Sequence, residues 1–193
     1  DFAIKKGTIT REFYNEMIDK LKEMPEKVSK ALEQEEYIKN DVAKTLKDAN
    51  SAFYLGRGLD YNLAMEGALK IKEISYIHAE GYPAAEMKHG PIALVTDQLP
   101  VVFISTKDTS YEKIVSNVQE IKARKGKIIC VATEGDTVIP SMANDIIYVP
   151  ETDELLTPIL NVIPLQLLSY YIGIAKGYNV DMPRNLAKSV TVE

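Results

Sequence analysis

The spacing of apolar residues divides the chain into a helical first quarter and a longer region of alternating strands and helices. From about Arg11 to Asn50, apolar residues recur three or four positions apart among Glu, Lys and Asp, which is the period of an amphipathic helix. Pro25 has no backbone N–H to donate, so we expect it to separate a first helix from a second. The charged residues between the apolar ones are expected to form a solvated face.

Beyond Asn50 the pattern changes to short apolar runs separated by helical segments. The runs at 52–55, 100–105, 128–132 and 146–149 predict buried strands, and helices are predicted at 61–78, 110–124 and 157–176. Thr157 and Pro158 form a helix start, and Gly177 is expected to end that helix. Strands that are apolar throughout and alternate with helices indicate an α/β fold with a parallel sheet covered on both faces. Such a sheet binds ligands beyond the carboxyl ends of its strands.

The loop Gly56-Arg57-Gly58 falls at one of those carboxyl ends. It is not a dinucleotide-binding fingerprint, because no third glycine follows at the required spacing. A plain turn between a strand and a helix is the alternative interpretation.

The predicted helix at 61–78 carries a charged stripe on an otherwise apolar surface. At 100° per residue, Glu66, Lys70 and Glu73 fall on one side, and a helix with so little polar surface is normally buried. One interpretation is ordinary ion pairs between residues three and four apart. The other is a pocket wall with Glu73 as a general base and Lys70 as its electrostatic partner. The helix alone leaves both open.

The two histidines differ in their predicted surroundings. His78 is expected to pack or cap at the end of the 61–78 helix. His89 lies in Lys88-His89-Gly90-Pro91, where Gly and Pro disfavour regular structure, so it is the better candidate for a ligand contact on a loop. Neither His-x-x-x-His nor a cysteine pair is present, so we predict no metal site and no metal cofactor.

Composition narrows the function classes. A net charge of -5 in 193 residues argues against nucleic acid as a partner, although an anionic small substrate remains open. The single cysteine, Cys130, lies in a predicted buried strand, which favours a reducing, cytoplasmic setting. The apolar run 159–175 is interrupted by Asn161, Pro164 and Gln166, so it predicts a buried helix and no membrane span. The chain begins at Asp1, and we expect it to be a piece of a longer protein.

Several segments together resemble the glutamine–fructose-6-phosphate aminotransferases, also called glucosamine-6-phosphate synthases. The C-terminal sequence from Pro183 to Glu193 is similar to the end of that family. Three further segments carry the resemblance: 55–58 with the helix 66–74, the stretch 86–91, and 163–168. The similarity covers essentially the whole chain and points to the second SIS (sugar isomerase) domain plus the C-terminal tail.

The resemblance implies a fold, a reaction and roles for single residues. The fold is a three-layer SIS domain with a five-stranded parallel sheet, and the parent reaction converts fructose 6-phosphate and glutamine-derived ammonia to glucosamine 6-phosphate. Glu73 would move a proton between C1 and C2, with Lys70 assisting. His89 would open the sugar ring in the site of a neighbouring subunit of a homodimer, and Lys188 would form a Schiff base with the substrate. His89, Ala187 and Lys188 would contact the sugar phosphate.

Two departures from the family pattern limit that expectation. Ala85 stands where the family usually has Gly. The loop at 105–110 reads Ser-Thr-Lys-Asp-Thr-Ser and lacks the phosphate-gripping Ser-x-Ser-Gly pattern of the first SIS domain. We therefore expect a helical segment at 1–50, the second SIS domain at 51–178 and the tail at 179–193, without the glutaminase or the first SIS domain.

Three functions remain in view. The chain is either the isomerase half of the synthase, inactive alone, or a regulatory SIS module that binds sugar phosphates without turnover, or a purely structural dimerisation half-domain. Lys188 discriminates between the first two, because a sensor has no need of a Schiff-base lysine.

Overall fold

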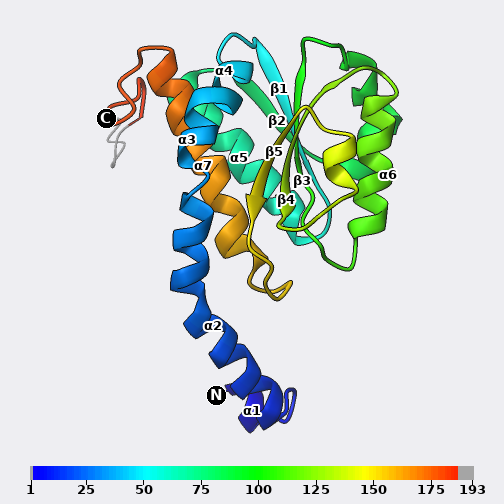
Figure 1. Cartoon of the computed structure of the whole chain (residues 1–193), viewed down its shortest axis with the longest axis vertical. Coiled ribbons are helices and arrows are strands. Elements are labelled where there is room, and N and C mark those ends of the chain that lie inside the picture. The colour runs from blue at the N-terminus through cyan, green and yellow to red at the C-terminus, as the bar shows by residue number, and fades with distance from the viewer. Residues whose placement is uncertain (1, 187–193) are drawn as a thin grey trace, which may run out of the picture.

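The computed structural model describes residues 2–186 and contains one five-stranded parallel sheet (Figure 1). Its strand order is β2-β1-β3-β4-β5, and every pairing is parallel. The strands are β1 (Ser51–Gly56), β2 (His78–Pro83), β3 (Pro100–Ile104), β4 (Lys127–Thr133) and β5 (Asp145–Val149). Helices cover both faces, as the continuous apolar runs of the central strands require. The predicted α/β class and the five-stranded parallel sheet are therefore confirmed.

The first face of the sheet is covered by α5 (Leu59–Ser75) and α7 (Thr157–Ala175), supported by the short π-helix η1 (Ile38–Val42) and α4 (Ala43–Leu46). Their apolar side chains form one core with the strand residues that face them. Its fully buried members include Ile38, Leu46, Tyr54, Ile71, Leu165 and Leu168. α7 is long and apolar enough to cross a membrane by length and composition. Here it is a central helix of the domain, packed against α5.

The second face is covered by α6 (Tyr111–Lys122) and three 3-10 helices, η2 (Ala84–His89), η3 (Pro91–Leu94) and η4 (Ile139–Ser141). Ile114, Val118 and Ile121 of α6 pack against the other faces of β1, β3 and β4. Figure 1 shows α6 on the opposite side of the sheet from α5 and α7. The sheet thus separates two apolar cores, one on each side.

The N-terminal segment consists of α1 (Phe2–Lys5), the long α2 (Arg11–Leu32) and α3 (Glu35–Tyr37). The prediction that Pro25 separates two helices was wrong, because α2 continues through it. Met24 and Ala31 on either side of Pro25 are buried against the domain, so packing holds the helix together despite the missing backbone donor. The first half of α2 projects beyond the sheet in Figure 1.

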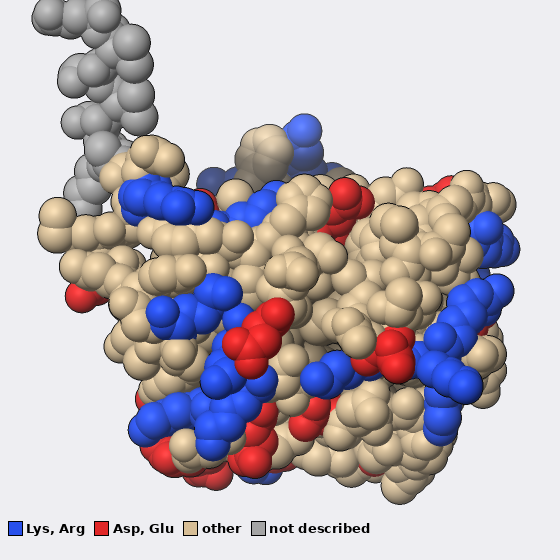
Figure 2. Space-filling view, turned by 90° about the horizontal axis from the view of Figure 1, so that it is seen from above, with Lys and Arg blue, Asp and Glu red and all other residues tan. Residues whose placement is uncertain are grey.

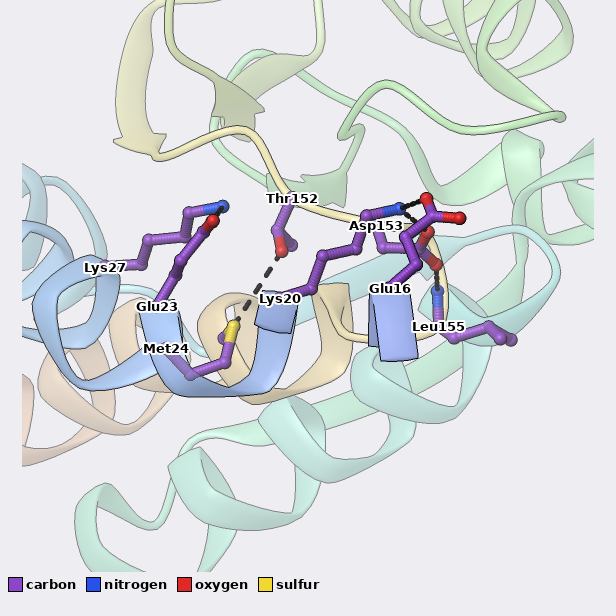
Figure 3. A network of polar contacts seen from close by, with 8 residues as sticks. All are labelled: Glu16, Lys20, Glu23, Met24, Lys27, Thr152, Asp153 and Leu155. Atoms are coloured by element: carbon purple, nitrogen blue, oxygen red, sulfur yellow. Dashed lines mark hydrogen bonds and ion pairs between the residues drawn. The ribbon is translucent and has the colours of Figure 1, made fainter. Parts of the chain in front are cut away.

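Polar contacts attach α2 to the loop that follows β5. Figure 3 shows Lys20 between the carboxylates of Glu16 and Asp153, with Nζ–O distances of 2.6 and 2.7 Å. Asp153 also accepts a hydrogen bond of 3.0 Å from the backbone N–H of Leu155. The hydrogen bond from Lys20 is the main reason that the pKa of Asp153 is lowered. These contacts fix α2 to the end of the sheet from which α7 begins.

The strand β2 was missed by the sequence analysis, which extended the preceding helix to His78. The helix α5 ends at Ser75, Tyr76 takes a left-handed conformation at its C-terminus, and His78 opens β2 with an exposed side chain. β2 is an edge strand with the sequence His-Ala-Glu-Gly-Tyr-Pro, which contains no continuous apolar run. A Cβ on its Gly81 would come within 2.5 Å of Met65 Cα, so the close packing of α5 excludes any side chain at this position.

The side of the molecule on which α7 ends carries charges of both signs. Figure 2, the view from above, shows Lys and Arg side chains interspersed with Asp and Glu. Such mixing gives no large field of one sign on this face.

Candidate active site

Lys70 and Glu73 lie in contact one turn apart on α5. Lys70 Nζ is 2.6 Å from Glu73 Oε2 and 3.6 Å from Glu66 Oε1. The side chains of Lys70 and Glu73 are 30% and 29% exposed, so the pair is half-buried but open to solvent. The hydrogen bond to Glu73 raises the pKa of Lys70, opposed by partial desolvation, so the amine stays charged beside the carboxylate.

The packing of α5 explains why this stripe faces outward. Leu63, Ala64, Ala68 and Ile71 are buried on the sheet side, and Gly67 lets the helix lie against the ring of Tyr54. A Cβ on Gly67 would be 2.8 Å from that ring. The charged stripe lies opposite this buried face. Its residues form the ion pairs that the simpler interpretation predicts. The carboxylate of Glu73 also remains accessible from solvent, as a general base requires.

The chain beyond α7 returns to the end of this same helix. The backbone N–H of Arg184 donates a hydrogen bond of 2.9 Å to the hydroxyl of Tyr76, which follows directly after α5. The predicted site residues Ala187 and Lys188 lie outside the described residues. The described contacts bring the segment that leads to them to the end of α5 that bears Lys70 and Glu73.

His89 lies in the other layer of the fold. It is the last residue of η2, whose Met87 is buried in the core on the α6 side, whereas α5 packs in the core on the opposite side. The loop expected around His89 is in fact this 3-10 helix, which ends at Gly90 with a φ of 154°. His89 is exposed, and its Nε2 is 3.9 Å from Glu86 Oε2. The described structure therefore brings Lys70 and Glu73 together and places His89 across the sheet from them.

The carboxyl ends of β1 and β3 carry a buried polar cluster that the sequence analysis missed. Asp60, Thr106 and Asn161 are at most 4% exposed. Thr106 Oγ1 donates to Asp60 Oδ2 at 3.1 Å, and Asn161 Nδ2 donates to Asp60 Oδ1 at 2.9 Å. Burial raises the pKa of Asp60 to about 6, opposed by these two hydrogen bonds. The available signal was Asn161, a polar residue within the largely apolar α7.

The loop Gly56-Arg57-Gly58 at the same edge is a tight strand-to-helix turn. A Cβ on Gly56 would meet the backbone oxygen of Asp60 at 2.3 Å, so only glycine fits where the chain folds back. Arg57 Nη1 donates to Asn117 Oδ1 at 3.0 Å, which directs the guanidinium towards α6. The turn joins β1 to α5 and fixes where α5 begins.

The loop after β3 uses its polar groups within the fold. Ser105 Oγ donates to the carbonyl of Val131 at 3.0 Å, and Ser110 Oγ donates to Asp108 at 2.9 Å. Thr109 Oγ1 donates to Glu154 at 3.1 Å. Hydroxyls engaged with two carboxylates make a poor grip for a phosphate group, in agreement with the departure from the family pattern noted in this loop.

One cavity formed by the described residues lies away from these groups. It has a volume of about 440 Å³ and is lined at the amino ends of β1 and β2 by residues including Asn50, Ser51, His78 and Glu80. Lys70 and Glu73 do not line it.

Comparison with known proteins places these features in a wider context. The SIS domain model matches residues 45–175. The chain is 55% identical over 192 residues to the glutamine–fructose-6-phosphate aminotransferase (isomerizing) of Chlorobaculum tepidum, covering 99% of this chain and 31% of that protein. The protein of the same name from Bacteroides thetaiotaomicron is 54% identical over 191 residues, with coverages of 99% and 31%. The chain thus spans less than a third of the length of these relatives.

Solved structures show the same fold. The C-terminal domain of glucosamine-fructose-6-phosphate aminotransferase from Francisella tularensis has a TM-score of 0.85 and 38% identity, covering 92% of this chain and 50% of that one. A glucosamine-6-phosphate deaminase from Thermotoga maritima has a TM-score of 0.70 at 23% identity, covering 99% and 53%, and shares the fold alone. The described architecture is therefore similar throughout to the C-terminal part of longer proteins.

Proposed function

The chain belongs to the SIS domain family, and from that premise we propose that it is the C-terminal isomerase part of a glutamine–fructose-6-phosphate aminotransferase. Its substrate would be fructose 6-phosphate and the product of the parent enzyme glucosamine 6-phosphate. Domain boundaries at 51–178 for the SIS domain and 179–193 for the tail, and a cytoplasmic location, belong to the same proposal.

The proposed chemistry is a proton shift between adjacent carbons. Once nitrogen has replaced the C2 oxygen of the ketose as an imine, Glu73 removes a proton from C1 and the nitrogen takes up a proton, which gives an enolamine. The same carboxyl group returns its proton to C2 while the C1 hydroxyl loses a proton, which leaves an aldehyde at C1 and an amine at C2. No electrons enter or leave, so the step needs an acid–base group and no redox partner.

The contact of Lys70 Nζ with Glu73 Oε2 at 2.6 Å supports this proposal most directly. A lysine held beside the base can neutralise negative charge that develops on the substrate oxygen. Lys188 would form an imine with the C2 carbonyl and release water. The nitrogen bound to C2 could then be exchanged. Lys188 would thus act at C2, and Glu73 at C2 and the neighbouring C1.

The position of His89 in the opposite layer supports its assignment to a neighbouring subunit. A homodimer could bring the His89 of one copy to the Lys70–Glu73 pair of the other. The engaged hydroxyls of the loop at 105–110 support a phosphate site built by a different domain. We therefore propose that the active site is composite and that this chain alone does not turn over.

Sodium borohydride reduction tests the proposal. The full-length protein that contains this chain should yield a fructose 6-phosphate adduct on Lys188, located by mass spectrometry, and should form glucosamine 6-phosphate. The 193-residue chain alone should not interconvert fructose 6-phosphate and glucose 6-phosphate. A full-length protein that binds the sugar phosphate with no adduct and no turnover would instead be a non-catalytic SIS module.

A further inference from the structure

We propose that Tyr76 is a positioning residue that holds the described segment after α7 against the end of α5, the helix that bears Lys70 and Glu73, and that the proposed reaction depends on this contact. The inference rests on the proposed function and deepens it, because it assigns to Tyr76 a task that the sequence comparison did not indicate. It is carried by contacts between described residues.

A sharp reversal of the chain begins the path of this segment. The N–H of Gly177 donates to the carbonyl of Ile174 at 2.9 Å, and the N–H of Tyr178 donates to that of Gly173 at 3.0 Å. With φ at 74° for Gly177, these two bonds form a Schellman motif that ends α7. The chain is thereby turned back across the neighbouring helix α5.

The returning segment packs between α5 and α7 at Gly173. A Cβ on Gly173 would lie 2.8 Å from the side chain of Val180 and 3.1 Å from the carbonyl oxygen of Ile74. Val180 therefore packs where α7 offers no side chain, next to the last turn of α5. The side chain of Asn179 accepts hydrogen bonds from the N–H groups of Asp181 and Met182, which tightens the turn that follows.

Tyr76 then holds the segment in three ways. The Arg184 guanidinium carbon lies 4.0 Å from the centre of its ring, a cation–π contact. The Arg184 N–H donates to the Tyr76 hydroxyl at 2.9 Å. The rings of Tyr76 and Tyr178 pack together with their centres 4.9 Å apart. The positive guanidinium also lies at the C-terminal end of α5, where the helix dipole favours a cation.

The backbone at Tyr76 indicates that this side chain serves a purpose. Tyr76 has φ 58° and ψ 20°, a left-handed conformation that costs free energy for tyrosine and little for glycine. Glycine would suit the turn better, so the contacts of the ring and hydroxyl are the physical gain at this position. Lys188 is the fourth residue after Arg184 in the sequence, and four residues span at most about 14 Å. We therefore expect the contacts that hold Arg184 to raise the effective concentration of the Lys188 amine near α5.

Tyr76→Gly separates this role from a role in folding, because it relieves the backbone while removing the clamp. Trypsin must take the Arg184 side chain into its specificity pocket, so cleavage between Arg184 and Asn185 reports release from the Tyr76 ring. In the 193-residue chain we expect this cleavage to accelerate about tenfold in Tyr76→Gly. Cleavage after Arg124, on the far side of the sheet, should be unchanged. Tyr76→Phe keeps the ring and should be intermediate, and Tyr170→Ala removes an exposed tyrosine of α7 as the matched control.

The functional arm uses the full-length protein and the borohydride adduct on Lys188. Tyr76→Gly should lower kcat and the rate of trapping about tenfold with KM for fructose 6-phosphate nearly unchanged, and Tyr76→Phe should recover much of the loss. Faster cleavage at Arg184 with trapping at the wild-type rate would overturn the inference and leave the proposed function standing. Unchanged cleavage in Tyr76→Gly would also overturn it. If the wild-type protein traps no substrate, the proposed function fails and this inference falls with it.

Discussion

Lys70 Nζ lies 2.6 Å from Glu73 Oε2, and the side chains of both residues are about one-third exposed on the outer surface of α5. An exposed pair of this kind contributes only a few tenths of a kcal/mol to folding. The proposed role of the pair is chemical, and this separation of stability from activity can be measured.

Glu73→Gln should abolish turnover of the full-length protein while leaving its folding nearly intact. Loss of a general base lowers kcat by about 10²- to 10⁴-fold, whereas loss of the exposed ion pair moves the unfolding free energy by less than about 0.5 kcal/mol. Activity assays and thermal unfolding check the two parts. Glu36→Gln removes a similar carboxylate, paired with Lys39 at 3.2 Å, and should keep full activity.

Lys188→Arg should remove the borohydride-trapped adduct. Arginine keeps the charge but cannot lose a proton to attack a carbonyl under ordinary conditions, so no imine forms. Mass spectrometry of the reduced protein is the measurement, with Lys176→Arg as the control because Lys176 donates to the carbonyl of Lys47 in the fold. An adduct of wild-type yield in Lys188→Arg would remove Lys188 from the mechanism.

Mixing two inactive variants should restore activity. If His89 serves the partner, a dimer of one Glu73→Gln chain and one His89→Ala chain has one intact site and one site with both defects. Random reassociation of equal amounts then gives about a quarter of the wild-type turnover, because half of the dimers are mixed and each has half its sites. Activity that does not rise on mixing would place His89 in the same site as the Glu73 of its own chain.

Asp60→Asn should make stability less dependent on pH. The folded pKa of Asp60, about 6, lies above its ordinary value of 3.8, so the folded state binds the proton more tightly than the unfolded state. The stability this provides is present below about pH 4 and is lost as the pH rises through about 6, by up to roughly 3 kcal/mol.

Denaturant unfolding at a series of pH values checks this expectation. The wild type should lose stability relative to Asp60→Asn between about pH 4 and 7. Asp97→Asn, which changes an exposed carboxylate outside the cluster, should follow the wild type. A constant difference between Asp60→Asn and the wild type over this range would show that Asp60 does not titrate there.

Pro25→Ala should stabilise the protein, because α2 continues through this exposed position and regains a backbone hydrogen bond. The gain expected is about 1–3 kcal/mol, measured as a higher denaturant midpoint with an unchanged slope. Pro164 lies inside α7 but is buried, so Pro164→Ala also leaves a cavity and should gain less. A lower midpoint for Pro25→Ala would show that the proline is needed at this position.

The sequence was sufficient where burial alone decides the structure. The runs that became β1, β3, β4 and β5 are apolar because both of their faces are covered, and Gly177 ended its helix as predicted. β2 could not be recognised in this way. Gly81 in β2 is required by the close approach of α5. Packing between two segments leaves no local pattern in the sequence.

The candidate site, like the fold, could be predicted from the sequence only in part. Residues on one helix, such as Lys70 and Glu73, could be paired from spacing, because three positions along a helix fix their separation. Asp60, Thr106 and Asn161 come from three separate elements, and only the folded topology brings them together. The placement of His89 across the sheet also depended on the path of β2, which the apolar pattern did not predict.

The position of His89 across the sheet from the Lys70–Glu73 pair also bears on how the proposed reaction depends on protein concentration. If two copies share the site as proposed, turnover per chain should fall on dilution below the concentration at which copies associate. Activity would then report on assembly as much as on chemistry. A chain that has not yet associated with its partners would then not convert the sugar phosphate.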